Sequence, residues 1–471
     1  MHQSKTPTQN LTQILTIGVI EIDKIYLPKD EELTTDVIGK IIRYFELHHL
    51  PQLRKYEQYY SGNHDIMRRE VGDDSRPNNR IVKNYCASIV DNFQGYITGV
   101  PVTYSAKDDT DISELMEIFS ANDVVNTDSN FLLDALKYGV SYELCYINES
   151  QDKKFKNLDA KNVIPIYAND LDEELLYVIY YYPIVSWEDP VATKYKVNVY
   201  SRSDVFSYVS GGNFSFFEVA EEPKPHYFQQ VPFVIFDLNR DNRPVFDRVI
   251  TLNDAYNTLL SDEVNDFESF VDAYMVLKNL DATAEELAAM KQSRTILIDG
   301  ESDVDYLTKN ISDTQIQNLL DNIQQSIHTI SNSPDFSSEE FNSGVSSGVA
   351  LQYKLVGFNN VASSIEAQFR KALQKRIELL NSILSLVDSA ECKVNISFTH
   401  NLPANLTDIV TTVNALRGLV SDETLLTQIP FIEDTQKEIE KVKEQNADKQ
   451  QYYFNNFDSL GTEEEAEPEE E

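Results

Sequence analysis

A long helical repeat of apolar residues is the feature that most constrains the fold. Apolar side chains recur at steps of three and four, at Val249, Leu252, Tyr256, Leu260, Val264, Phe267, Val271 and Tyr274. This spacing predicts a helix of nearly thirty residues, roughly 40 Å long. Acidic residues occupy its other faces. Because one side is apolar, the helix needs a partner along its whole length.

Residues 312–331 predict that partner. Ser312-Asp313-Thr314-Gln315 is a capping box, and an apolar stripe follows it as far as Ile330. Between the two helices, residues 282–291 predict a short helix, while 295–298 and 304–307 predict a hairpin around Asp299-Gly300. Two long helices joined through a small α/β insert form a stalk with a tip.

A polar loop and a third long helix come next. Residues 331–348 are rich in Ser, Asn, Gly and acids, which indicates a loop. Apolar residues then return at helical steps from Leu351 to Leu384, beyond the usual helix length of roughly 8–20 residues. Further on we expect a strand at 393–398, a turn at 401–403 and helices at 408–419 and 435–444.

The first half of the chain mixes helices and strands. Residues 1–34 predict an arm with a weak strand at 17–25, and two helices follow, at 33–50 and up to Tyr60, separated by Pro51. A loop at 72–80 leads into a helix at 81–96. Runs rich in Tyr, Val and Ile then predict a mainly antiparallel sheet, with strands at 102–104, 142–147, 163–167, 176–183, 195–200, 205–208 and 214–219. The fold class is therefore α+β.

Length, charge and cysteine content narrow the class of protein. The 471 residues predict two or three structural units. The chain has 40 basic and 77 acidic residues, a net charge of -37, which opposes nonspecific binding of free nucleic acid. Its 3 widely spaced Cys exclude a disulfide framework and a paired-cysteine metal site. The sequence shows no export signal and no membrane-spanning run, so we expect a soluble cytoplasmic product.

Motifs for catalysis or cofactor binding are missing from the sequence. It contains no P-loop, no glycine-rich dinucleotide motif after a strand, no zinc-protease motif and no serine-hydrolase elbow. His48-His49 favours a surface or interface pair over a metal site, because adjacent residues point to different sides of a helix. Asp237, Asp241 and Asp247 favour a structural turn over a nuclease site. We expect no enzyme, no cofactor and no metal.

Short segments in a fixed order resemble the portal proteins of long-tailed phages that infect Gram-positive bacteria. The resemblance extends from about residue 35 to residue 445 and becomes specific only when the segments are taken together. They are Tyr59-Tyr60-Ser61-Gly62-Asn63-His64-Asp65-Ile66, Asn79-Arg80-Ile81-Val82-Lys83-Asn84-Tyr85, Ile89-Val90-Asp91, Tyr96-Ile97-Thr98-Gly99-Val100-Pro101-Val102, Asn332-Ser333-Pro334, Phe341, Ser347-Gly348-Val349-Ala350-Leu351-Gln352-Tyr353-Lys354, Asn401-Leu402-Pro403 and Ser421-Asp422-Glu423-Thr424.

The resemblance implies a portal-like division of the chain. A mixed α/β wing, two long stem helices, a small α/β clip, a long wing helix and a mainly helical crown are expected. The implied regions are an amino-terminal arm (1–34), the wing (35–247), the first stem helix (248–278), the clip (279–311), the second stem helix (312–331), a tunnel loop (332–348), the long wing helix (349–390), the crown (391–460) and an acidic tail (461–471).

The resemblance also implies a function and a set of partners. Copies of the chain, usually twelve, would form a ring at one vertex of the virus head, and double-stranded DNA would be packaged and ejected through its axis. The ring would assemble with scaffold and major capsid protein, dock the large terminase subunit, and later dock head-completion and connector proteins. It would reside in the virion, after a stage in the host cytoplasm, without any membrane. The alternative is a ring or coiled assembly scaffold without DNA passage.

Three groups of candidate residues follow from that implied arrangement. The tunnel loop would face DNA through Ser333, Asp335, Ser337, Ser338, Glu339, Glu340, Asn342, Ser343, Ser346 and Ser347. The first stem helix would line the channel with Asp254, Asp262, Glu263, Asp266, Glu268 and Asp272. The clip would dock terminase and connector through Lys291, Arg294, Asp299, Glu301 and Asp303.

Charge offers one physical argument for such a channel. Acidic helices around an axial passage repel the phosphates of a passing duplex and so prevent the contacts that would grip it. Solvation of the helix faces explains any single acid equally well. A basic cluster at Lys354, Arg370, Lys371, Lys375 and Arg376 could touch DNA, but pairing with neighbouring carboxylates is favoured.

Overall fold

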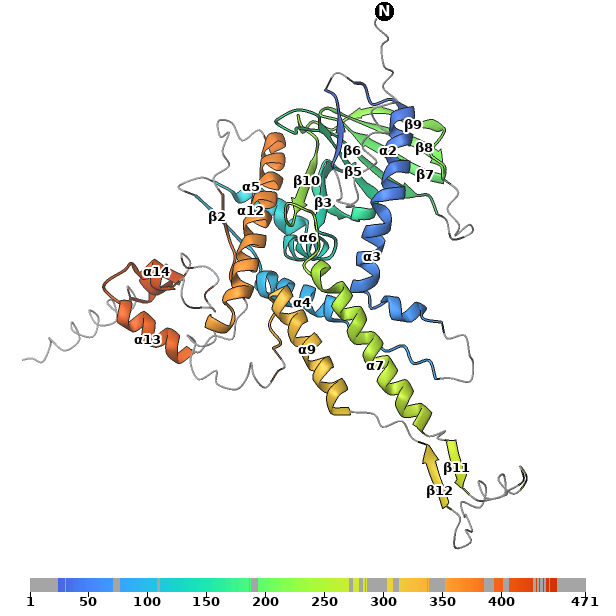
Figure 1. The fold of residues 1–471 in the computed structure, drawn as a ribbon. Helices are drawn as coiled ribbons and strands as arrows, with labels where there is room; N and C mark the ends of the chain where they lie inside the picture. Colours follow the sequence, from blue (N-terminus) through green and yellow to red (C-terminus); the bar gives the residue numbers. More distant parts are fainter. Residues whose placement is uncertain are drawn as a thin grey trace, which may run out of the picture. The chain divides into compact units, whose positions relative to one another are not determined.

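The fold of the chain is shown in Figure 1 from a computed structural model. The chain forms two compact units, residues 1–335 with 356–400 and residues 336–355 with 401–471. The residues that the structure describes are 24–29, 31–70, 77–107, 111–185, 187, 194–270, 274–278, 283, 285, 303–307, 313–336, 338, 352–384, 394–400, 406–426, 429, 432, 435, 438–439 and 441–446. Residues 17–23 of the strand predicted at 17–25, the acidic tail and most of the predicted clip and tunnel loop lie outside them.

Helices α2 (Thr35–His48) and α3 (Leu50–Tyr60) confirm the predicted helical start. The backbone N–H of Val37 donates to Thr34 Oγ1, which caps α2. Pro51 lies in the first turn of α3, where a missing N–H costs no helical hydrogen bond. A short 3₁₀ helix, η1 (Asp65–Arg68), follows.

Helix α4 (Tyr85–Thr98) begins later than predicted. Its cap is Asn84, whose Oδ1 accepts a hydrogen bond from Ala87 N at 3.0 Å. Residues 81–83 are not helical, because their backbone is bound to another helix, as described below. Helical spacing of apolar residues therefore predicted the element but not its first turn.

A six-stranded sheet confirms the predicted β-rich region. Its strand order is β1-β5-β6-β7-β8-β9; β1 pairs parallel with β5 and all other pairs are antiparallel. The strands are β1 (Ile25–Leu27), β5 (Val163–Ala168), β6 (Leu175–Pro183), β7 (Lys194–Tyr200), β8 (Asp204–Gly211) and β9 (Phe217–Pro225). The prediction of a strand from residue 214 is wrong at its start: Phe214 has φ 48 and lies in the turn before β9, with its side chain buried.

A second sheet and its helices form an aromatic core. The strand order is β10-β3-β4. Its elements are β3 (Val140–Ile147), β4 (Lys153–Leu158), β10 (Phe233–Asp237), α5 (Ser113–Ala121), α6 (Val124–Tyr138), η2 (Ala160–Asn162) and α12 (Val356–Leu384). Phe369 of α12 stacks on Phe236 of β10, with ring centroids 5.1 Å apart. The sequence analysis identified the third long helix and β3, and missed α5, α6, β4 and β10.

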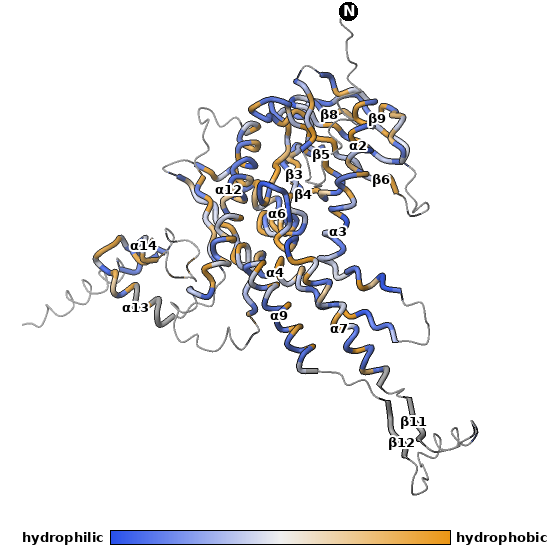
Figure 2. The backbone as a smooth tube through the Cα atoms, in the orientation of Figure 1, coloured by the Kyte–Doolittle hydropathy of each residue, from blue (hydrophilic) through white to orange (hydrophobic). Residues whose placement is uncertain are grey.

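The stalk consists of α7 (Ile250–Phe270) and α9 (Asp313–Ser331), with η3 (Asp247–Val249) before α7. Hydrophilic and hydrophobic residues alternate along both helices in Figure 2. The prediction of one helix to residue 274 is wrong at its end, since β11 (Tyr274–Lys278) is a strand. It pairs antiparallel with β12 (Asp303–Leu307). A short apolar run fits either structure, and here pairing with β12 decides in favour of strand.

Within the described residues β12 pairs with β11, and the predicted hairpin partner at 295–298 lies outside them. Of the predicted helix at 282–291, only residues 283 and 285 are described; 285 is helical and 283 is not. The remaining elements are β2 (Thr103–Ala106), paired antiparallel with β13 (Val394–Ser397), and α13 (Leu406–Leu416) and α14 (Asp422–Leu426) of the second unit. In the described part of the chain, none of the helices has the length and apolarity to cross a membrane.

Candidate functional site

One face of α7 carries a polar residue at every fourth position, and most of these residues are buried. We call this set the polar ladder: Asn253, Asn257, Ser261 and Asn265. The first three are 0% exposed. Buried amides and hydroxyls require hydrogen-bond partners, and here those partners belong to residues 77–84, which run alongside α7 without regular secondary structure. We call residues 77–84 the strap.

The ladder binds every second backbone amide of the strap. Asn79 N donates to Asn265 Oδ1 at 2.7 Å, Ile81 N donates to Ser261 Oγ at 2.9 Å, and Lys83 N donates to Asn257 Oδ1 at 2.8 Å. Asn253 Nδ2 donates to Lys83 O at 2.8 Å. Four helical residues advance about 6 Å and two extended residues about 6.6 Å, so the two periods match over this length. The strap is thus held as a strand would be, by side chains in place of a neighbouring strand.

His64 closes one end of this interface. Its Nδ1 accepts from Asn257 Nδ2 at 3.1 Å, and its Nε2–H donates to Tyr59 O at 3.0 Å. The ring is fully buried, and burial lowers the pKa of His64 below its usual value. His64 is therefore neutral in the fold, with its proton on Nε2.

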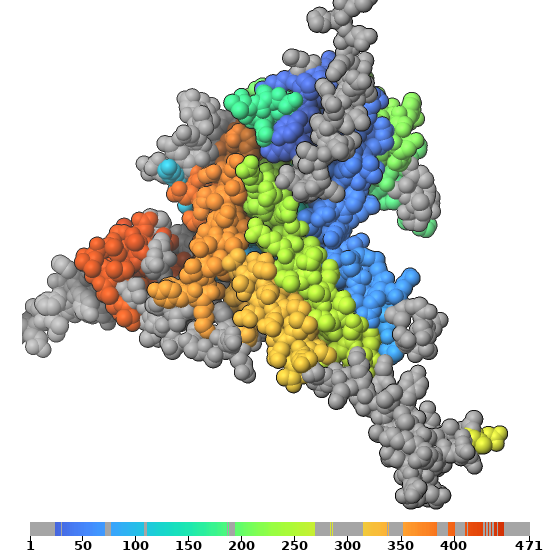
Figure 3. Space-filling model, viewed as in Figure 1, coloured from blue at the N-terminus to red at the C-terminus, as the bar shows by residue number. Residues whose placement is uncertain are grey.

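The predicted acidic lining of α7 is partly engaged within the chain. Asp254 Oδ2 accepts from the Tyr59 hydroxyl at 2.8 Å, and desolvation raises the pKa of Asp254. Asp262 pairs with Arg69 at 2.7 Å. Glu268 accepts from the side chain of Asn79 at 2.9 Å. These three contacts tie α7 to α3, to the end of η1 and to the strap, and residues from this part of the chain lie against α7 in Figure 3.

Glu263 and Asp266 are half-buried on the same helix, and Asp272 lies outside the described residues. The three pairings above do not test whether these acids line a channel, so that assignment stays a prediction.

A second set of polar residues joins the two stalk helices to the start of the predicted tunnel loop. We call it the loop base: Lys83, Asn92, Gln324, His328, Ser333 and Asp335. Lys83 Nζ donates to Gln324 Oε1 at 3.3 Å, and Gln324 Nε2 donates to Asp335 Oδ2 at 2.9 Å. Lys83 Nζ also contacts the Tyr256 hydroxyl on α7 at 3.3 Å. The strap, α7, α9 and the loop are thereby connected through one hydrogen-bonded chain.

Ser333 is the most buried member of the loop base. It is 0% exposed, and its Oγ accepts from Asn92 Nδ2 at 3.0 Å. Its carbonyl accepts from His328 Nδ1 at 2.8 Å, which places a proton on Nδ1. The other ring nitrogen, His328 Nε2, lies 3.7 Å from Asp335 Oδ2. The first residues of the loop are therefore fixed to α4 and α9 and are not free to follow a passing ligand.

The start of the predicted loop lies against the first turn of α12. Asn332 has φ 54, which turns the chain sharply at the end of α9. A Cβ on Gly357, in the first turn of α12, would lie 2.8 Å from Asn332 Oδ1. Glycine at 357 thus permits the close approach of Asn332 to α12.

Other predicted site residues fall mostly outside the description. Of the tunnel-loop candidates, Ser333, Asp335 and Ser338 are described. Those outside are Ser337, Glu339, Glu340, Asn342, Ser343, Ser346 and Ser347. In the clip, Asp303 begins β12, and Lys291, Arg294, Asp299 and Glu301 lie outside the described residues.

Two members of the predicted basic cluster, Lys375 and Arg376 of α12, pair with carboxylates within the chain, as the sequence favoured. Arg376 is 0% exposed and contacts two carboxylates, Asp128 Oδ1 at 2.5 Å and Glu143 at 2.7 Å. The Tyr104 hydroxyl completes the network through Asp128 at 2.5 Å. Lys375 pairs with Glu378 at 2.8 Å. Arg376 is therefore a structural charge, and DNA contact by this residue is excluded while it stays buried.

The polar ladder was missed by the sequence analysis. Its signal is a repeat of Asn, Asn, Ser and Asn at every fourth residue of a helix whose apolar stripe lies on another face. Polar side chains on a helix usually face solvent, so the sequence predicts that these residues are exposed. The strap, which lies far away in the sequence, covers them. In the same way, the pattern marked the apolar Phe267 as covered, yet it is 56% exposed.

Comparisons with known proteins agree with the resemblance seen in the sequence. The profile of the family described as "Phage portal protein, SPP1 Gp6-like" matches residues 40–452. The portal protein of Clostridium phage phiCD119 is 23% identical over 439 residues, covering 86% of this chain and 96% of that protein. The portal protein of Bacillus phage SPP1 is 22% identical over 473 residues, covering 94% of this chain and 90% of that protein. Since the family profile covers most of its length, the chain belongs to the phage portal protein family.

Proposed function

We propose that this portal protein assembles as a ring of about twelve copies at one vertex of a phage head, and that double-stranded DNA enters and leaves through the ring's axis. The observation that carries the proposal is the family match over residues 40–452. The paired stalk helices α7 and α9, with a loop anchored at the end of α9, support it. The role is structural, in line with a family of non-enzymatic proteins.

The regions of the chain keep the predicted boundaries in this proposal, apart from the end of the first stem helix. Residues 35–247 form the wing, α7 and α9 the stem, and 349–390 the long wing helix. The clip then begins with β11 and includes 279–311. The crown is formed by 391–460.

The tunnel loop, 332–348, narrows the channel around DNA. Its first residues are anchored in the loop base, so motion is confined to the part beyond Asp335. Small neutral groups such as serine approach phosphates without binding them tightly, and the acids at 335, 339 and 340 repel them. The loop therefore guides DNA and does not grip it.

The partners act at different parts of the ring. The clip docks the large terminase subunit during packaging and then head-completion and connector proteins. The wing contacts scaffold and major capsid protein. The ring resides in the virion at the portal vertex, after assembly in the host cytoplasm.

Two measurements test the proposal. Negative-stain images and the native mass of purified protein should show rings with an axial hole and a mass near twelve times 53.9 kDa. Deletion of residues 338–345 leaves the loop base intact, so rings should form while DNA packaging into heads falls. A stable monomer at high concentration contradicts the ring, and normal packaging by the deletion variant contradicts the tunnel-loop assignment.

A further inference from the structure

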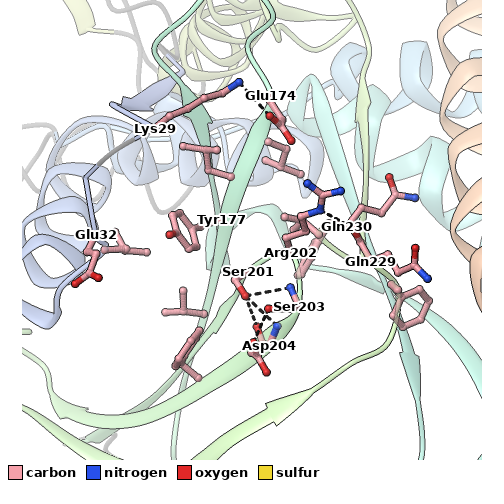
Figure 4. Close-up of a pocket in the computed structure, with 18 of the residues that line it drawn as sticks. Lys29, Glu32, Glu174, Tyr177, Ser201, Arg202, Ser203, Asp204, Gln229 and Gln230 are labelled. Atoms are coloured by element: carbon pink, nitrogen blue, oxygen red, sulfur yellow. Dashed lines mark hydrogen bonds and ion pairs between the residues drawn. The ribbon is translucent and has the colours of Figure 1, made fainter.

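A large groove lies between the six-stranded sheet, α2 and α12 in the described part of the chain. It has a volume of about 1120 Å³. Its floor is apolar and aromatic, formed by Tyr177 of β6, Val199 of β7, and Phe206 and Tyr208 of β8. Figure 4 shows its polar rim, with Arg202 and Asp204 at the turn between β7 and β8. Such a floor with a polar rim is suited to an apolar side chain that carries one hydrogen-bonding group.

The same sheet also presents exposed apolar side chains at the end of one hairpin. Strands β6 and β7 form a hairpin that is closed by Ile184 N donating to Lys194 O at 2.9 Å. Beyond it, Ile184, Val185 and Trp187 are 46%, 56% and 90% exposed. We call these three residues the hairpin tip. An exposed tryptophan beside two exposed aliphatic residues is typical of an anchor for another protein surface.

Topology places the hairpin tip and the groove at opposite ends of the same strands. The tip joins the end of β6 to the start of β7, whereas the groove is lined by the start of β6 and by the turn from β7 to β8. Strand β6 has 9 residues, which corresponds to about 30 Å. A chain therefore cannot place its own tip in its own groove. A second copy, arranged head to tail, can do so.

We propose that the hairpin tip of each copy inserts into the sheet groove of the next copy, with Trp187 as the anchor. The contact is heterologous, because two different surfaces meet, and repetition of a heterologous contact closes a ring when the rotation between copies permits. The indole N–H of Trp187 donates to an oxygen on the rim, and Ile184 and Val185 cover the aromatic floor. The inference rests on the proposed ring and adds the surfaces that join its wings.

Disulfide trapping tests which surfaces meet. In a Cys392→Ser background, Val185→Cys and Ser203→Cys are combined in one chain; the natural Cys86 and Cys145 are buried and do not interfere. Mild oxidation of assembled protein should give a series of disulfide-linked multimers, seen as regularly spaced bands on a denaturing gel. Each single variant alone should give no disulfide-linked product, and a mixture of the two should give disulfide-linked dimers and nothing larger. Dimers from Val185→Cys alone would show a symmetric tip contact and overturn the proposal.

A pair of substitutions tests whether the contact matters for assembly. Trp187→Glu should reduce the fraction of protein in rings roughly tenfold at limiting concentration, as loss of an anchor residue does. Leu47→Glu is the matched control, since Leu47 is 70% exposed on α2, away from the groove, and should leave rings unchanged.

The outcomes separate this inference from the proposed function. Intact rings without disulfide-linked multimers would overturn the tip-in-groove contact but not the proposed ring. Wild-type protein that never forms rings would overturn the proposed function itself. A cross-link from Ser203→Cys to Ile14→Cys, in place of Val185→Cys, would assign the groove to the amino-terminal arm and also overturn the inference.

Discussion

The molecule joins its helices to their neighbours in two different ways. Helix α12 packs on β3 and β10 through aromatic rings, with one fully buried charge network around Arg376. Helix α7 binds the strap through a ladder of polar side chains, each with its own backbone partner. Both interfaces are buried, yet one concentrates its polar contacts at a single point and the other distributes them along the helix.

The two interfaces fix the register of their helices in different ways. An apolar face is nondirectional and would permit α12 to slide, so the charges at Arg376, Asp128 and Glu143 select one position. A ladder fixes register at every step, because a shift by one residue would leave several buried groups without partners. We therefore expect that one substitution breaks the α12 interface, while the α7 interface loses stability step by step.

The largest expected effect comes from Arg376→Ala. This change leaves Asp128 and Glu143 buried without their cation, which should cost about 3–5 kcal/mol of unfolding free energy. Urea unfolding of the isolated chain measures it. Lys375→Ala, one residue away and partly exposed, is the control and should cost less than about 1 kcal/mol. Equal losses for both variants would show that the charge network does not hold α12.

Asn257→Ala should be smaller in effect. It removes the acceptor of Lys83 N and the donor to His64, and stability should fall by about 1–3 kcal/mol because buried polar groups lose their partners. Thr258→Ala, on the exposed side of the same helix, controls for helix propensity. Protection of the strap amides against hydrogen exchange should fall in the Asn257 variant only. Unchanged protection at Ile81 and Lys83 would contradict the ladder.

Ser333→Ala tests whether the loop base acts like the ladder. The change removes one acceptor and leaves Asn92 Nδ2 without that partner, so the expected loss is about 1 kcal/mol. The informative readout is hydrogen exchange at residues 332–335, which should speed up while exchange in α12 stays unchanged. Faster exchange throughout α12 would mean that the loop base and the aromatic core are one cooperative unit.

The sequence predicted elements better than it predicted interfaces. Apolar periodicity identified α2, α3, α9 and α12, because their buried faces are apolar. It extended α7 into β11, since a strand of Tyr, Met, Val and Leu also fits a helical repeat.

The site was harder to predict for a physical reason. The sequence pattern predicts that Asn253, Asn257 and Ser261 face solvent, and only a strap that lies 170 to 180 positions earlier in the chain buries them. Contacts of that sequence separation leave no local signal. The end of α9 and the start of the loop after it, by contrast, were predictable from Asn332-Ser333-Pro334, because a turn and a helix end are local features.

The smallest expected effect is on the pH dependence of the unfolding free energy, and it distinguishes the α7 interface from the α12 interface. Burial lowers the pKa of His64 in the fold below the ~6.5 of an unfolded chain. Between those two values the unfolded state binds more protons, so the contribution of His64 is complete above about pH 6.5 and declines as the pH falls through the folded pKa. Asp254 and Asp65 face the ring and oppose this shift, and Asp254 has a raised pKa that acts in the opposite direction at lower pH.

Comparing wild type with His64→Gln between pH 7.5 and pH 5.5 cancels the carboxylates: wild type should lose more stability on acidification than the variant, and strap amides should lose protection before those of α12. If both proteins respond to acid alike, the ring of His64 is not neutral in the ladder, and the α7 interface does not depend on its proton.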